Sequence, residues 1–340
     1  MNGDDESVIT YTLSREPGEE VGTYTITPEG AEEQGNYIVV FETGTLTIEN
    51  APKKGLGDFS LIWLTDTLLA KEGDRTDAFK AIVAYAAENA KKLGSIAMLD
   101  SGNMVETYND VDTWSLMKEE LKQFQLLYPE LPFYSVAGTK DVNGNEMNYE
   151  AYLAAELNSK THTFKDVTRE DGDEAIWYQT LKGQPALVVG IGYQKIAETD
   201  EEKERQDAWL KFLNDAIKAR KEHYVILLVN DFIDEKGELT EFGKLIEENI
   251  VKDNDNVRLI LCGNANGVAT WEKTYGERKV NALMYNYVAD AENGLGFVRI
   301  LTFNSKDQTI TIDTVNPFTD ATEYDKEHPE KDHFVIEEAF

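Results

Sequence analysis

The sequence predicts an α/β protein in which two mixed sheets pack together and are flanked by helices, preceded by a small all-β domain. Three observations lead to this fold class. Residues 1–50 contain short strand-like runs without helical periodicity, residues from 58 onward alternate apolar strands with amphipathic helices, and the last part returns to strand pairs. Alternation that ends in hairpins indicates two sheets covered by helices rather than one doubly wound sheet.

The composition is that of a globular and strongly acidic protein. Of the 340 residues 41% are hydrophobic, which is enough for a large core in one or two domains, and the formal net charge is -31. Such an acidic surface repels nucleic-acid phosphates and anionic membranes, so neither is expected as a partner. The single cysteine, Cys262, excludes a disulfide framework, and no apolar run approaches the ~20 residues of a membrane span.

The first ten residues, MNGDDESVIT, have no basic or apolar signal region. The sequence alone therefore leaves two expectations for localisation. The protein is either cytoplasmic, or it is a secreted protein from whose front the leader has been trimmed.

The predicted domain boundaries follow from changes in residue composition and hydrophobic pattern. Residues 1–50 hold four runs rich in Thr, Tyr, Val and Ile, which predict antiparallel strands: VITYTL, GTYTIT, NYIVVF and GTLTIE. Residues 51–57 have the Pro, Gly and Lys content of a linker, and residues 58–340 form the large domain.

Strands and helices then alternate along the large domain. Strands are predicted at 59–65, 95–100, 133–138, 186–192, 224–230 and 257–263. Apolar residues at helical spacing predict one helix that Gly94 ends and another that Pro129 ends, with further helices near 201–220 and 239–251. The tail segments KVNALMYNY, GFVRILTF and TITIDTV predict antiparallel strand pairs.

Small polar residues gather at the ends of five predicted strands. Loops at the carboxyl ends of such strands are where α/β proteins place their chemistry. The five strand ends are at residues 63–69, 98–106, 136–142, 227–233 and 261–267.

The order and spacing of these strand ends resemble the calcineurin-like metallophosphoesterases, and the resemblance spans roughly residues 58–340. It implies a four-layer αββα fold. It also implies two divalent metals ~3.5–4 Å apart, held by carboxylate, imidazole and amide ligands from several strand ends, which activate water and clamp the phosphate.

At the positions that the resemblance assigns to the site, this sequence departs from the family pattern. The ligand positions hold Asp66, Leu68, Asn103, Thr139, Asn230, Asn264 and Asn266, and Lys140 stands in place of the catalytic histidine. Only Asp66 retains an ionisable ligand, and neutral amides and a leucine are not donors that transition metals select. We therefore expect a vestigial site without catalytic residues, metal or cofactor.

Two questions about this site stay open at the level of sequence. Lys140 either pairs with Asp66, as an ammonium replacing the missing cation charge, or points into solvent. Leftover carboxylates at the strand ends either hold a hard cation such as calcium or are solvated and capping groups: Asp100, Asp141, Asp231 and Asp234.

Residues 13–49 resemble the C-terminal part of MBG-type repeats, β-domains of large bacterial surface and secreted proteins. The residues that carry the resemblance are Arg15, Gly18, Gly22 and Tyr24. It implies an extracellular or cell-surface location and a role either as a spacer or as a binder of a surface partner.

Three functions are consistent with these observations. The first is a non-catalytic metallophosphoesterase-fold domain that binds or scaffolds an unknown ligand or cell-surface partner. The second is an active phosphoesterase with metal ligands redrawn from Asp66, Asp100, Asp141 and Asp231. The third is an adhesin segment in which the MBG-like domain is the binder.

Overall fold

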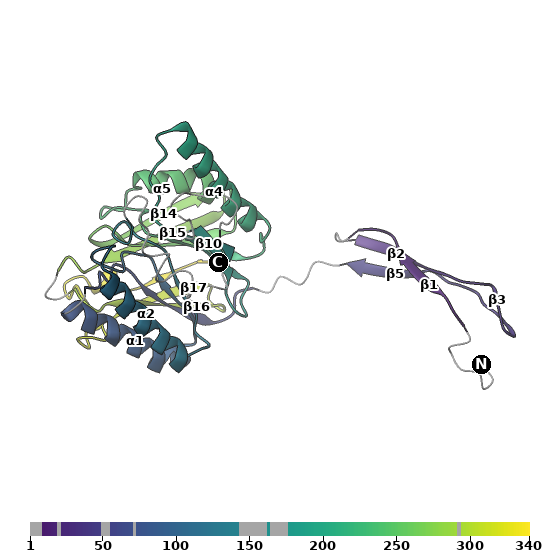
Figure 1. The fold of residues 1–340 in the computed structure, drawn as a ribbon, viewed down its shortest axis with the longest axis horizontal. Coiled ribbons are helices and arrows are strands. Elements are labelled where there is room, and N and C mark those ends of the chain that lie inside the picture. Colours follow the sequence, from purple (N-terminus) through teal and green to yellow (C-terminus); the bar gives the residue numbers. More distant parts are fainter. Residues whose placement is uncertain are drawn as a thin grey trace. The chain divides into compact units, whose positions relative to one another are not determined.

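The computed structural model describes residues 9–18, 22–48, 55–70, 73–142, 162–163, 176–290 and 294–340. The chain divides into two compact units, Met1–Lys54 and Gly55–Phe340 (Figure 1). Residues 51–54 of the predicted linker lie outside the described residues.

The first unit is a small antiparallel sheet, as predicted. Its three strands are β1 (Thr12–Arg15), β2 (Gly22–Glu29) and β5 (Gly44–Ile48), in the order β1-β2-β5. The predicted strand NYIVVF is reduced to β4 (Tyr37–Ile38), which pairs only with β3 (Glu33–Gln34).

The second unit contains two mixed sheets. The six-stranded sheet has the order β18-β17-β16-β6-β7-β8. Strands β6, β7 and β8 are parallel, whereas β16, β17 and β18 add in antiparallel fashion. The bounds are β6 (Phe59–Leu64), β7 (Ser95–Asp100), β8 (Phe133–Ser135), β16 (Val298–Asn304), β17 (Thr309–Val315) and β18 (His333–Ile336).

The seven-stranded sheet has the order β14-β15-β13-β12-β11-β10-β9. Its central strands β11, β12, β13 and β15 are parallel, and the outer strands are antiparallel. The bounds are β9 (His162–Thr163), β10 (Ile176–Thr180), β11 (Ala186–Ile191), β12 (Tyr224–Val229), β13 (Val257–Cys262), β14 (Gly267–Tyr275) and β15 (Arg278–Asn286).

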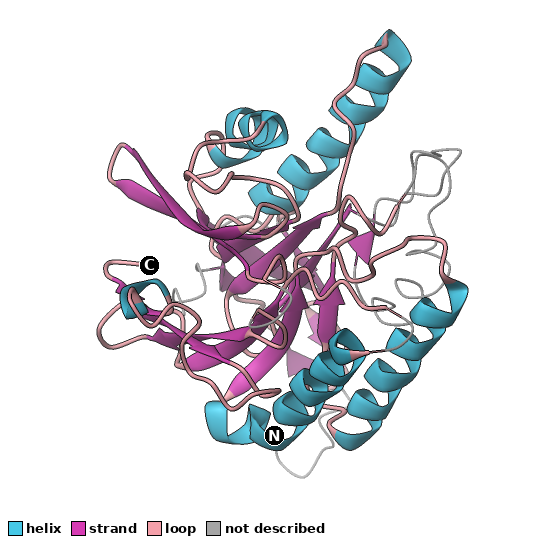
Figure 2. Cartoon of the chain, turned by 90° about the vertical axis from the view of Figure 1, so that its left-hand side faces the viewer, coloured by secondary structure: helices cyan, strands magenta, loops and turns pink. Residues whose placement is uncertain are grey.

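Helices cover the outer faces of both sheets (Figure 2). Helices α1 (Asp74–Leu93) and α2 (Val111–Leu127) pack on the six-stranded sheet. Helices α4 (Asp200–Lys218) and α5 (Glu241–Ile246), the latter continued by a π-helical turn (Glu247–Val251), pack on the seven-stranded sheet. A 3-10 turn (Pro329–Lys331) precedes β18. Among the described helices, none is long and apolar enough to cross a membrane.

The period-two alternation of β6 explains how both faces of a sheet are buried. Leu61 and Trp63 belong to the core between the two sheets, whereas Ile62 and Leu64 pack beneath α1 and α2. All four side chains are fully buried. The layers are therefore helix, sheet, sheet and helix, which confirms the predicted fold class.

Helix ends follow the chemistry of the sequence. Gly94 ends α1 in a left-handed conformation, as predicted. Thr199 and Glu202 form a capping box at the start of α4, and the Asp110 carboxylate accepts hydrogen bonds from the first backbone N–H groups of α2. These caps fix where the helices begin relative to the strand-end loops.

Candidate functional site

The loops after five strands meet at one edge of the two sheets. The loops after β6, β7 and β8 come from one sheet, and those after β12 and β13 come from the other. Five of the eight predicted site residues contribute their side chains to one hydrogen-bond network there: Asp66, Asn103, Thr139, Asn230 and Asn264.

Asp66 lies at the centre of this cluster and is only 1% exposed. Its Oδ1 accepts a hydrogen bond from Asn103 Nδ2 (2.9 Å), while its Oδ2 accepts from the backbone N–H of Asn264 (2.9 Å) and the hydroxyl of Thr65 (2.7 Å). Burial raises the pKa of Asp66 to about 6, and the three hydrogen bonds oppose that rise. Both carboxylate oxygens are thus already engaged by the protein.

The Asn103 amide is saturated in the same way. Its Nδ2 also donates to Asn264 Oδ1 (3.2 Å), and its Oδ1 accepts from the backbone N–H of Lys140 (2.9 Å). The Thr139 hydroxyl lies between the two amide oxygens, 3.3 Å from Asn103 Oδ1 and 3.2 Å from Asn264 Oδ1. One hydroxyl therefore bridges two loops that come from different sheets.

Asn230 and Asn264 extend the network to its rim. Asn230 Oδ1 accepts from the backbone N–H of Thr139 (3.2 Å), and its Nδ2 donates to the backbone carbonyl of Ser101 (3.0 Å). The side chain of Asn264 hydrogen-bonds the half-buried carboxylate of Asp231. The residues that could have bound a ligand bind one another.

Asn286 belongs to the network and was missed at the sequence level. Its Nδ2 donates to the backbone carbonyl of Asn264 at 3.3 Å. It ends β15, which pairs in parallel with β13, so it reaches the same edge of the sheet. Its position as a polar residue at the end of an apolar strand was the feature that could have identified it.

The backbone of the site is held in an unusual conformation. Among the described residues, seven other than glycine have positive φ, and four of them are here: Asp66 (50°), Leu68 (44°), Asn103 (57°) and Asn264 (70°). Such strain persists only where the surroundings enforce it. Gly263 shows how tight the packing is, because a Cβ there would lie 2.2 Å from Asp66 Oδ2 and 2.0 Å from Thr65 Oγ1.

Three predicted site residues keep their side chains out of the network. Leu68 packs with Ala78, Val288 and Leu295 in a small apolar cluster. Asn266 is exposed, and no hydrogen bond of the described residues joins its side chain to the cluster. Lys140 takes part through its backbone N–H only.

The suggested direct ion pair between Lys140 and Asp66 is not formed. The Lys140 side chain is exposed, and no ion pair between these two described residues is present. Its positive charge is the weakest of the influences that lower the pKa of Asp66. The backbone turn that delivers the Lys140 N–H to Asn103 leaves the ammonium in solvent, where hydration stabilises it better than a buried partner would.

The leftover aspartates have structural partners. Asp141 is fully buried and accepts backbone N–H groups from Val105 (3.1 Å) and Gly138 (2.8 Å), and burial raises its pKa to about 7. Asp100 accepts from Gly102 N–H (2.8 Å), and burial, with the charges of Asp141 and Asp66 nearby, raises its pKa well above its ordinary value.

Asp234 lies in an exposed turn, where its Oδ1 accepts from the backbone N–H groups of Lys236 and Glu238 (2.9 Å each). This is the capping alternative that the sequence left open.

Two of the histidines have partners away from the strand-end site, since His328 contacts Glu330 and His333 contacts Asp313.

These residues do not fit a two-metal centre. The predicted ligand positions supply one carboxylate, Asp66, whose two oxygens already accept three hydrogen bonds. The other donors are neutral amides and a hydroxyl, which transition metals bind poorly. Within the part of the chain that the structure describes, no group of three or more His, Cys, Asp or Glu side chains is placed to hold a metal ion.

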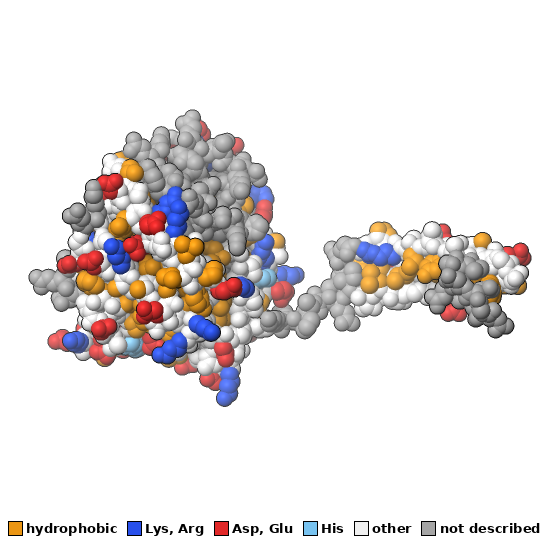
Figure 3. Space-filling model, turned by 60° about the horizontal axis from the view of Figure 1, so that its bottom comes forward, with side chains coloured by type: hydrophobic (Ala, Val, Ile, Leu, Met, Phe, Trp, Pro, Cys, Tyr) orange, Lys and Arg blue, Asp and Glu red, His pale blue; other side chains and the backbone are white. Residues whose placement is uncertain are grey.

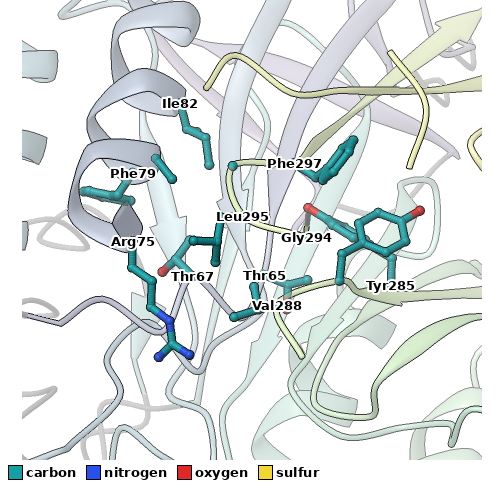
Figure 4. A pocket seen from close by; sticks show the side chains of 13 residues that line it. Thr65, Thr67, Arg75, Phe79, Ile82, Tyr285, Val288, Gly294, Leu295 and Phe297 are labelled. Carbon is teal, nitrogen blue, oxygen red and sulfur yellow. The ribbon is translucent and has the colours of Figure 1, made fainter. Parts of the chain in front are cut away.

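A small cavity adjoins Thr65 and Thr67 (Figure 4). Side chains of α1, including Arg75 and Phe79, lie on one side of it, and Tyr285 lies on the other. Its volume of about 20 Å³ is enough for roughly one water molecule. It offers no room for a phosphoester substrate.

Comparisons with known proteins agree with the two units. Residues 1–47 match the family model of the MBG domain (YGX type). The uncharacterized protein YvnB of Bacillus subtilis (strain 168) is 23% identical over 294 residues, which cover 82% of this chain and 21% of YvnB. The chain thus spans about a fifth of the length of this curated relative.

Solved structures share the fold at low sequence identity. A dimetal phosphatase from Danio rerio superposes with a TM-score of 0.51 and 9% identity, covering 82% of this chain and 98% of that one. GAP50, the anchor in the inner membrane complex of Plasmodium, gives a TM-score of 0.52 and 12% identity over 83% of this chain and 88% of its own. Residues 1–47 thus match the MBG domain model, and the large unit has the fold of the dimetal phosphatase.

Proposed function

We propose that the large unit is a non-catalytic phosphoesterase-fold domain with a binding or scaffolding role in a bacterial secreted or surface protein. One observation carries this proposal. The side chains at five of the converging positions are joined in one hydrogen-bond network: Asp66, Asn103, Thr139, Asn230 and Asn264.

Hydrolysis by a two-metal site requires a metal-bound water of lowered pKa and a positive centre to stabilise the transferred phosphoryl group. To take part in such a site, Asp66 and Asn103 would first have to give up the hydrogen bonds they make now. Each buried group released in this way costs about 1–3 kcal/mol, so the closed network competes with metal binding.

A scaffolding role is supported by a solved structure with the same fold. GAP50 has the same fold and is described as an anchor. The MBG match at residues 1–47 supports placement in a bacterial surface or secreted protein. These two similarities and the hydrogen-bonded strand-end site together support the proposal.

Metal analysis combined with a phosphoesterase assay tests the proposal. We expect no stoichiometric Zn, Mn or Fe in the purified chain, and no hydrolysis of p-nitrophenyl phosphate or its bis-ester with added Mn²⁺. The control pair is Asp66→Asn and Asp234→Asn, which remove a carboxylate inside and outside the site. Two metal ions per chain, or hydrolysis that only Asp66→Asn abolishes, would overturn the proposal.

A further inference from the structure

A larger cavity of the second unit lies outside the strand-end site. It is lined by Asp290 after β15, by Phe297 just before β16, and by residues of the segment 319–326 between β17 and β18. Its volume of about 460 Å³ falls within the roughly 300–1,000 Å³ of pockets that hold small molecules. None of the described lining residues belongs to the hydrogen-bond network around Asp66, so this is a separate candidate site.

Two aromatic rings form part of its wall. The ring centroids of Phe297 and Tyr324 are 5.6 Å apart, and the two rings are perpendicular, at 90°. Tyr287 stacks against one face of Tyr324 at 4.2 Å, so only the other face of Tyr324 is left for a ligand. The face of an aromatic ring carries partial negative charge and attracts cations.

Carboxylates outnumber cations in the described lining, with Asp290, Glu323 and Asp325 against Lys326. Asp290 Oδ2 lies 3.3 Å from the hydroxyl of Tyr324, which donates to it. Burial, and next the negative charge of Asp290, raise the pKa of Tyr324. The aromatic wall therefore stands in a region of negative potential.

Glu323 is the carboxylate that remains available to a ligand. It is half-buried, and it forms no hydrogen bond or ion pair with any residue that the structure describes. Asp325, in contrast, is engaged: its Oδ2 accepts from Lys331 Nζ (3.2 Å), and its Oδ1 accepts from the backbone N–H groups of Glu327 and His328 (3.1 Å each).

The aromatic wall is held in place from behind. Asp332 is fully buried, and its Oδ2 accepts from the backbone N–H groups of Tyr324 (2.8 Å) and Asp325 (3.0 Å). Its Oδ1 accepts from the hydroxyl of Tyr287, to which Arg299 Nη2 also donates (3.2 Å). These bonds fix the ring positions before any ligand arrives, which lowers the entropic cost of binding.

We propose that this cavity binds a small organic cation of the alkylammonium class, with its charge between the Tyr324 ring and the Glu323 carboxylate. Aromatic faces beside a carboxylate are suited to such groups, because an alkylammonium combines apolar surface with a diffuse positive charge. The formal net charge of -31 attracts cations to the molecule as a whole. The proposal does not depend on whether the strand-end site is catalytic.

Ligand-observed NMR titration of the full chain with tetramethylammonium chloride at low salt tests this. We expect saturable binding with a Kd in the millimolar range, and no binding of tert-butanol, which is similar in size but uncharged. Nα-acetyl-lysine amide, titrated in parallel, separates two sources of the same chemistry. Tighter binding of tetramethylammonium would indicate a free amine as the ligand, and tighter binding of the lysine derivative would indicate a basic side chain of a partner.

Two pairs of variants locate the site. Tyr324→Leu should weaken binding about tenfold, whereas Tyr324→Phe keeps the ring and should bind like the parent. Glu323→Gln should weaken binding several-fold. Its matched control is Glu327→Gln, which removes an exposed carboxylate outside the lining and should leave the Kd unchanged.

Three results would overturn the proposal. The first is the absence of saturable binding, and the second is equal binding of tert-butanol, because apolar burial alone would then be responsible. The third is equal weakening by Glu323→Gln and Glu327→Gln, which would indicate diffuse attraction to an acidic surface. This pair decides the matter even if Tyr324→Leu fails to fold, because Glu323 contributes no hydrogen bond to the described structure.

Discussion

The strand-end site of the large unit and the sheet of the N-terminal unit differ in polarity and in burial. The site is polar, buried and satisfied by its own hydrogen bonds around Asp66. The sheet face around Leu13 is apolar, and Leu13 itself is 62% exposed; Figure 3 shows hydrophobic side chains on the visible face of this unit. The comparison shows that the polar side chains of the large unit are held mainly by one another, whereas the small sheet leaves part of its apolar face exposed.

The largest expected effect comes from filling the closest approach in the site. Gly263→Ala places a Cβ against Asp66 Oδ2 and Thr65 Oγ1, so the network must open. We expect a loss of about 2–3 kcal/mol in the free energy of unfolding, measured by urea denaturation. Gly55→Ala is the control, because nothing lies within 4 Å of its Cβ position, and it should be neutral. A stable Gly263→Ala variant would mean that the network is loose.

Removing one amide from the network is expected to cost slightly less. Asn103→Ala deprives Asp66 of one donor and leaves the Lys140 N–H without its acceptor. The expected loss is about 2 kcal/mol in the free energy of unfolding. Asn266→Ala, at the exposed position two residues after Asn264, should change stability by less than about 0.5 kcal/mol. Equal effects of the two variants would contradict the distinction between network and rim.

The buried carboxyls predict a pH dependence of unusual sign. The pKa values of Asp66 (about 6) and Asp141 (about 7) are raised above the ordinary value of 3.8. The folded state therefore binds more protons than the unfolded state between about pH 4 and 7, so this contribution to stability is lost as the pH rises through that window. Each carboxyl contributes about 1–3 kcal/mol to the decline.

Urea unfolding at pH 5 and pH 8 measures this dependence. Asp66→Asn should reduce it by the share of that carboxyl, because the amide does not titrate, while Asp141 retains its own share. Asp234→Asn should not, because the pKa of that exposed carboxyl is lowered by its turn hydrogen bonds. A parent protein whose stability increases from pH 5 to pH 8 would show that the site carboxyls are ionised and well stabilised throughout.

The smallest effect is expected for Lys140→Met. The ammonium is exposed and forms no ion pair with Asp66, so its removal should change the free energy of unfolding by less than about 0.5 kcal/mol. Chemical denaturation beside Asn103→Ala gives the comparison. A loss as large as that of Asn103→Ala would restore the buried ion pair that the sequence suggested.

Strand and helix patterns were enough to predict the fold class. The short apolar runs at 224–230 and 257–263 form strands as predicted, and Gly94 ends its helix in a left-handed conformation. Strand β14 (Gly267–Tyr275) was missed because it is an edge strand in which only Ala269 is buried and the apolar and polar residues do not alternate clearly. The parallel pairing of β15 with β13 was missed because it skips the intervening strand in the sequence.

The site was predictable as a set of chain positions, but its side-chain directions were not. The strand ends fix the backbone positions of Asp66, Asn103 and Asn264, and their amide and carboxylate groups are then close enough to form hydrogen bonds. The directions of Leu68 and Lys140 depend on backbone dihedrals and on neighbours such as Val288, which come from distant parts of the chain.

The central claim is that the strand-end site is closed by its own hydrogen bonds and holds no ligand of the phosphoesterase kind. Thermal unfolding with EDTA, and then with excess Mn²⁺ and inorganic phosphate, tests it most directly. A ligand at 100 times its Kd would stabilise the folded state by about 2.7 kcal/mol and raise Tm by several degrees. We predict the same Tm in all conditions; a rise that Asp66→Asn removes and Asp234→Asn preserves would contradict the claim.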